Sequence, residues 1–73
     1  MRVLQIMDML KLGNNTLIAV NDPCEDIKNG SGLLDENGKP YVILSIGTNS
    51  NKDNINITNI LIEGELESKK IFV

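Results

Sequence analysis

Short runs of alternating apolar and polar residues follow one another along the chain and are separated by glycine, asparagine and proline. Residues 2–12 and 16–20 form the first two runs, with Gly-Asn-Asn between them at 13–15. Glycine and asparagine tolerate the positive φ angles that a tight turn requires. The pattern therefore predicts a hairpin, which ends where Asn21-Asp22-Pro23 interrupts sheet pairing.

The first run fits two interpretations. A strand would place one set of side chains on a common face, broken in the middle by Asp8: Leu4, Ile6, Leu10 and Leu12. A helix would align Val3, Met7 and Leu10, but no N-cap residue precedes the run. We favour the strand, with Asp8 at a barrel rim or paired with a lysine.

A second hairpin is predicted further along the chain. Leu33-Leu34 leads into Asp35-Glu36-Asn37-Gly38-Lys39, and an apolar run follows at 40–46. Asn-Gly between two apolar runs is a strong hairpin signal. Both faces of 40–46 are largely apolar, so we expect a central strand, with a solvated turn at 35–39.

The remaining segments are assigned by their polarity. Residues 22–32 are expected to form a loop that Ile27 attaches to the core, and residues 47–54 a second loop. A strand should follow, with its apolar side chains on one face: Ile55, Ile57, Ile60 and Ile62. The apolar end of the chain at 71–73 should pair in a sheet.

Five to seven short strands with regular turn signals indicate an all-β fold. We predict a small closed or partly open antiparallel β-barrel of about six short strands, which spans residues 1–73 as one domain. Closure would remove edge strands that are prone to aggregate.

The order of these segments resembles the second domain of translation elongation factors, a small β-barrel module. The resemblance rests on residues 9–19, with a glycine turn before a threonine-led strand, on the Ile-Lys-Asn-Gly step at 27–30, and on the strand at 42–46. It implies the barrel fold, and association with RNA or the ribosome as one expected function. No glycine-rich phosphate loop is present, so it implies no nucleotide hydrolysis.

Composition argues against catalysis. The chain contains no histidine and a single cysteine, Cys24. Without histidine the usual general base is missing, and neither a Cys-His nor a Ser-His-Asp nucleophile can be formed. We expect no enzyme activity, no metal and no cofactor. The acidic neighbours Glu25 and Asp26 would raise the pKa of the Cys24 thiol. A lone cysteine, the absence of a signal-peptide pattern and the absence of a long apolar run favour the cytoplasm over a secreted or membrane location.

The net charge of −3 argues against nucleic-acid binding, which depends on lysine and arginine. We therefore expect a noncatalytic module that binds another macromolecule, most plainly a protein. The candidate contacts are an acidic loop, Asp22, Glu25 and Asp26, and an acidic stripe on a predicted strand, Glu63, Glu65 and Glu67. RNA or ribosome association and a structural homo-oligomer are the alternative functions.

Overall fold

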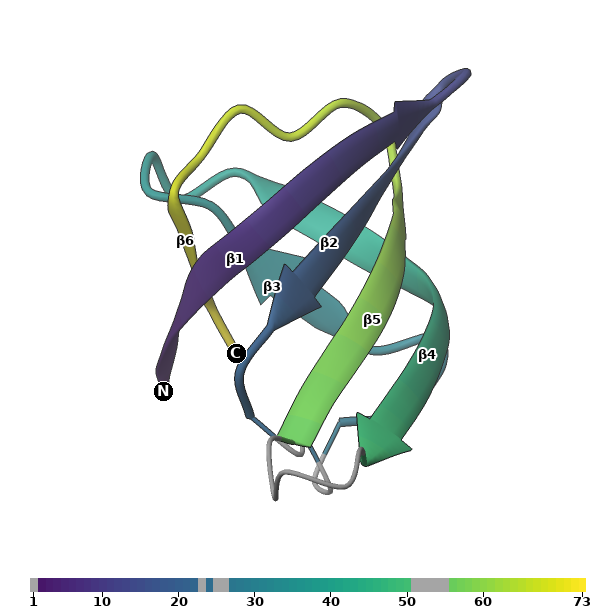
Figure 1. Cartoon of the computed structure of the whole chain (residues 1–73). Helices are drawn as coiled ribbons and strands as arrows, with labels where there is room; N and C mark the ends of the chain where they lie inside the picture. Colours follow the sequence, from purple (N-terminus) through teal and green to yellow (C-terminus); the bar gives the residue numbers. More distant parts are fainter. Residues whose placement is uncertain (1, 23, 25–26, 51–55) are drawn as a thin grey trace.

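The computed structural model describes residues 2–22, 24, 27–50 and 56–73. Six strands form a closed antiparallel barrel in the order β1-β2-β5-β4-β3-β6 (Figure 1). Their bounds are β1 Val3–Leu12, β2 Asn15–Val20, β3 Gly32–Leu34, β4 Pro40–Ser50, β5 Asn56–Glu63 and β6 Lys70–Phe72. The predicted all-β barrel is confirmed, and residues 2–12 are a strand rather than a helix.

Both predicted hairpins are present. Leu12 pairs with Asn15 around a two-residue turn, in which Gly13 has a φ of 63°. Leu34 pairs with Pro40 across the second turn, in which Gly38 has a φ of 80°. Glycine at these positions avoids the steric cost that a Cβ atom would have at positive φ.

The C-terminal strand closes the barrel between the two hairpins. Residue Leu4 of β1 pairs with Ile71 of β6, and Leu34 of β3 pairs with Phe72 on the other side. The prediction that the apolar end of the chain joins a sheet is thereby confirmed.

A β-bulge in β1 changes which of its side chains face the core. The register shifts between Ile6 and Asp8, after which Met9 faces inward, opposite the buried Ile18. Leu10 and Leu12 are therefore 56% and 47% exposed, and the expectation that they share a buried face with Leu4 is wrong. A bulge inserts one residue and so reverses the inward and outward positions that follow it.

β4 is central in the strand order, between β3 and β5, as expected, but only one of its two apolar faces is buried. Tyr41 and Ile43 are buried, whereas Val42 and Leu44 are 48% and 41% exposed. A small barrel buries only its inner face, so the outer apolar residues of β4 remain accessible. β4 also extends through Gly47 to Ser50, in the first half of the segment expected to be a loop, because β5 pairs with it there. Residues 51–54 of that loop lie outside the described residues.

Strand β5 buries two of the four isoleucines that were expected to share a face, Ile60 and Ile62. Thr58, Ile60 and Ile62 face the core, while Ile57 is half-buried on the outer side. Ile55 lies outside the described residues. Ile27 packs against the core as predicted. The buried apolar residues are Leu4, Ile18, Val20, Cys24, Leu33, Tyr41, Ile43, Ile60, Ile62, Leu66 and Ile71.

Candidate functional site: an outer leucine face and an acidic barrel end

Leucine side chains form a row across the outer surface of three neighbouring strands. Leu10 of β1 lies opposite Leu17 of β2, and Leu17 lies opposite Leu61 of β5. Directly opposed residues on one face have Cβ atoms about 5 Å apart, so the row is continuous. Leu12 follows Leu10 on the same side of β1. We call Leu10, Leu12, Leu17 and Leu61 the leucine face.

The borders of the leucine face carry negative charge. Asp8 lies opposite Ala19 on one side, and Glu63 lies opposite Asn15 on the other. Among the described residues at outward positions of β1, β2 and β5, these are the charged ones. The small Ala19 leaves a hollow of about 110 Å³ beside Leu10 and Leu17. The face is thus apolar in the middle, slightly hollowed, and acidic at two borders.

The connection between β5 and β6 crosses one end of the barrel, the upper end in Figure 1. The hydroxyl of Thr16, which is fully buried, donates to the Gly64 carbonyl at 2.8 Å and accepts the Leu66 N–H at 3.2 Å. Leu66 is itself fully buried. One threonine hydroxyl therefore attaches the connection to β2 and holds Leu66 in the core.

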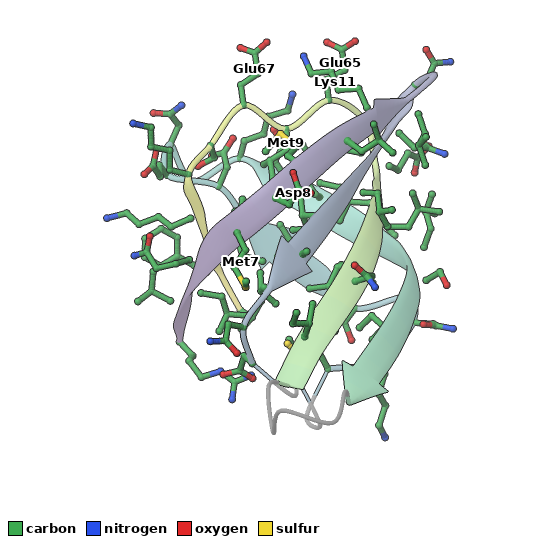
Figure 2. The ribbon with its side chains drawn as sticks, viewed as in Figure 1. Met7, Asp8, Met9, Lys11, Glu65 and Glu67 are labelled. Carbon is green, nitrogen blue, oxygen red and sulfur yellow. The ribbon has the colours of Figure 1, made fainter. Side chains whose placement is uncertain are left out.

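The three glutamates of the expected acidic stripe do not share a strand. Glu63 is the last residue of β5, and Glu65 and Glu67 lie on the connection, with the buried Leu66 between them. That part of the prediction is wrong, because residues 65–68 pair with no strand. Figure 2 shows Glu65 and Glu67 both pointing upward from the connection, on the same side of the molecule, and Glu67 pairs with Lys11 at 3.6 Å.

Asp35 is buried in the second hairpin rather than solvated at its tip. Its Oδ1 accepts the N–H groups of Asn37 and Lys39, and its Oδ2 accepts the Tyr41 hydroxyl. Three hydrogen-bond donors hold the pKa of the Asp35 carboxyl below its usual value. The Lys39 N–H has the largest effect, and the Asn37 N–H and the Tyr41 hydroxyl follow. Burial raises the pKa of the Tyr41 phenol, and Asp35 raises it further. The group is a structural brace.

Acidic residues predominate at this upper end. Asp35, Glu65 and Glu67 line one hollow there together with Lys39, and Glu63 ends β5 nearby. Lys11 is paired with Glu67, and Lys39 lies over the Tyr41 ring. Glu65 and Glu67 are exposed, so this end presents negative charge to solvent.

Asp22 lies two residues after β2, which ends toward the lower end of the barrel in Figure 1. Its carboxylate accepts the Cys24 N–H at 2.8 Å and pairs with Arg2 at 3.5 Å, and its carbonyl accepts the Thr58 hydroxyl. Asp22 is therefore engaged in fixing the chain after β2. Glu25 and Asp26, the other residues of the expected acidic loop, lie outside the described residues.

The Cys24 thiol is buried at this lower end. Burial raises its pKa, and Asp22 raises it further. A buried, protonated thiol is a poor nucleophile.

The leucine face was missed from the sequence. Simple alternation places Leu10 and Leu12 on one face with Leu4 and Ile6, and the pairing of Leu17 with Leu61 depends on strand order. One signal was present in the sequence. Asp8 interrupts an apolar face, and a charged residue at such a position could have indicated a bulge that exchanges the inward and outward positions.

Within the described residues, no group of three or more Cys, Asp or Glu side chains is placed to hold a metal ion, and no helix is long and apolar enough to cross a membrane. Comparison with family models, curated proteins and solved structures finds no match for the chain.

Proposed function

We propose that the chain is a noncatalytic β-barrel module that binds another protein through the leucine face. The observation that carries the proposal is the unbroken row of Leu10, Leu17 and Leu61 across three strands. Contiguous apolar surface on a small folded domain is typical of an interaction site. We infer that the module acts in the cytoplasm, where its single thiol would remain reduced.

The charges around the face indicate the kind of protein partner. Asp8 and Glu63 border the leucines, and the acidic upper end lies beyond Leu12. A partner segment with an apolar centre and flanking lysine or arginine residues would bury the leucines and neutralise the borders. A second copy of the chain would bring further carboxylates instead, which weighs against the homo-oligomer.

Surface chemistry weighs against the RNA alternative. Binding to single-stranded RNA relies on cationic grooves and on aromatic rings that stack on bases. Of the two aromatic residues, Tyr41 is buried and Phe72 is half-buried. The resemblance to the elongation-factor barrel therefore supports the fold more than it supports RNA binding.

Affinity capture with matched variants tests the proposal. The experiment would use the tagged wild-type chain, the double variant Leu10→Ser/Leu12→Ser and the control Val42→Ser. Each would be incubated with lysate of the source organism, both with and without nuclease treatment. Val42 is as exposed as Leu12 but lies on β4. We expect one stoichiometric protein to be retained by the wild type and the control and lost by the double variant.

Three other outcomes would overturn the proposal. Equal capture by all three chains would place the contact elsewhere. Partners that disappear only on nuclease treatment would support the RNA alternative. Light scattering would show that the leucine face joins two copies if the wild type has twice the monomer mass and the double variant has the mass of the monomer.

A further inference from the structure

The upper half of β1 has one unpaired edge. On one side β1 pairs with β2 as far as Leu12, but on the other side β6 pairs only with Val3, Leu4 and Gln5. The last backbone contact on that side is the Ile6 N–H, which donates to the Lys69 carbonyl at 3.0 Å. From residue 7 to residue 12, no described strand lies beside this edge of β1.

The register identifies the backbone groups that face this edge. Leu12 and Asn15 close a two-residue turn, and such a closing pair is hydrogen-bonded. Hydrogen-bonded pairs alternate along an antiparallel ladder, so Leu10 also points its N–H toward β2. The N–H and C=O groups of Met9 and Lys11 consequently point away from β2.

An independent contact agrees with this assignment. The Met9 N–H is bonded to the Oδ1 atom of Asp8 at 2.9 Å rather than to another strand. A backbone carbonyl of an added strand could replace the Asp8 carboxylate as the acceptor of the Met9 N–H. Asp8 is exposed, so water would then solvate its carboxylate. Polar caps of this kind protect sheet edges against indiscriminate pairing and leave them open to a specific strand.

Open space lies beside the Met7–Met9 part of the edge. A hollow of about 440 Å³ is lined by β1 from Gln5 to Met9 and by Ser68 and Lys69 at the end of the connection. Figure 2 shows Met7, Asp8 and Met9 along β1, with Glu65 and Glu67 on the connection above. The Lys11–Glu67 pair links β1 to the connection, and an exposed ion pair of this kind opens at little cost.

We propose that the unpaired edge of β1, between Met7 and Leu12, binds an extended basic segment of a partner protein by strand addition. This inference rests on the proposed protein-binding function and specifies how the partner is held. The partner's backbone pairs with Met9 and Lys11, and its outward side chains continue the apolar surface beside Leu10 and Leu12. Its cationic side chains face Glu65 and Glu67.

Charge selects a heterologous partner over a second copy. Two copies joined edge to edge at β1 would pair antiparallel, so the part of the second copy nearest to Glu65 and Glu67 would be the Met7–Asp8 end of its edge, which supplies no cation. A lysine- or arginine-containing strand meets those carboxylates favourably. For Glu65, no ion pair is present within the described part of the chain, so its carboxylate can accept a cation without displacing one.

A displayed library of random 12-residue peptides, selected against the full chain, supplies the probe. The tightest peptide would be synthesised and titrated against wild type, Lys11→Pro and Lys11→Ala. Proline removes the edge-facing N–H of Lys11, and alanine removes the same charge but keeps the N–H. We expect basic peptides with alternating apolar residues, and binding about tenfold weaker for Lys11→Pro than for Lys11→Ala.

Amide hydrogen exchange in the wild-type chain provides a second measurement that does not depend on the folding of the proline variant. Strand addition should slow exchange at Met9 and Lys11 when the peptide binds, with little change at Leu10, whose N–H already bonds to β2. Binding that is weakened by Leu17→Ser, but leaves Met9 and Lys11 unprotected, would overturn strand addition and leave the leucine-face function intact.

Two further results also count against the inference. If no peptide is enriched, strand addition fails, and affinity capture with the leucine-face variants tests the protein-binding function separately. If the free chain is a dimer that Lys11→Pro dissociates and Lys11→Ala does not, the edge is occupied by a second copy, and the heterologous partner is excluded.

Discussion

The Tyr41 hydroxyl lies 3.1 Å from the Oδ2 atom of Asp35 and 3.2 Å from the Glu65 carbonyl, so one phenol links the second hairpin to the connection. The Oδ1 atom of Asp35 meanwhile accepts two N–H groups within its own turn. The position of Glu65 at the acidic end therefore depends on a buried side chain that makes no contact with the leucine face.

Acid should weaken the fold through Asp35. Its folded pKa is lowered from the ordinary value of 3.8, chiefly by the Lys39 N–H, so its stabilising contribution is present above the unfolded pKa. This contribution is lost as the pH falls through the folded pKa. Urea unfolding between about pH 6 and about pH 3 would compare wild type with Asp35→Asn, which cannot titrate. The gap in stability should narrow in acid, and a gap that stays constant would contradict the prediction.

The Tyr41 phenol should titrate above 10.0 in the folded chain, because burial and the Asp35 carboxylate both raise its pKa. A raised folded pKa stabilises the protein below the unfolded value, and this stabilisation is lost as the pH rises through the folded pKa. Tyr41 is the sole tyrosine and tryptophan is absent, so phenolate absorbance reports this group alone.

The matched variant for this titration is again Asp35→Asn. Removing the carboxylate should bring the midpoint down, while the part that is due to burial remains. A midpoint that is the same in both chains would show that Asp35 does not act on the phenol.

Local signals in the sequence were sufficient for the turns. Gly13 and the Asn37-Gly38 pair marked the two hairpins because their backbone preferences are intrinsic to the residues. The apolar runs beside these turns predicted the strands, and the short length of the strands predicted a barrel. These features need no information about which strand pairs with which.

The site depended on information that alternation does not contain. The bulge between Ile6 and Asp8 exchanges the inward and outward positions of β1, and it arises from how β1 pairs with both β2 and β6. Likewise, Leu66 lies in a segment without strand periodicity, and it is buried because its side chain fills the upper end of the barrel interior. Pairing and closure are tertiary effects, so the leucine face was not predictable from periodicity.

Replacing Thr16 by valine should destabilise the chain by roughly 1–3 kcal/mol. The isosteric change keeps the packing but leaves the Leu66 N–H and the Gly64 carbonyl without their partner. Thr16→Ser keeps the hydroxyl and should lose clearly less. Urea unfolding of the two variants would measure the difference, and equal losses would show that the hydroxyl contributes nothing.

Truncation of Leu66 should have the largest effect of the changes considered. Leu66→Ala removes a fully buried side chain that fills the upper end of the barrel, and such changes cost about 2–5 kcal/mol. For a small domain this is a large part of the total stability. Leu12→Ala is the matched control, because that leucine is 47% exposed and should change stability by no more than about 0.5 kcal/mol. Thermal unfolding of both would test this, since similar losses would mean that the connection does not fix Leu66 in the core. The two variants also separate stability from binding. Leu12→Ala should weaken partner binding and leave the stability of the fold almost unchanged. Leu66→Ala should lower the stability but bind the partner normally at temperatures where it remains folded.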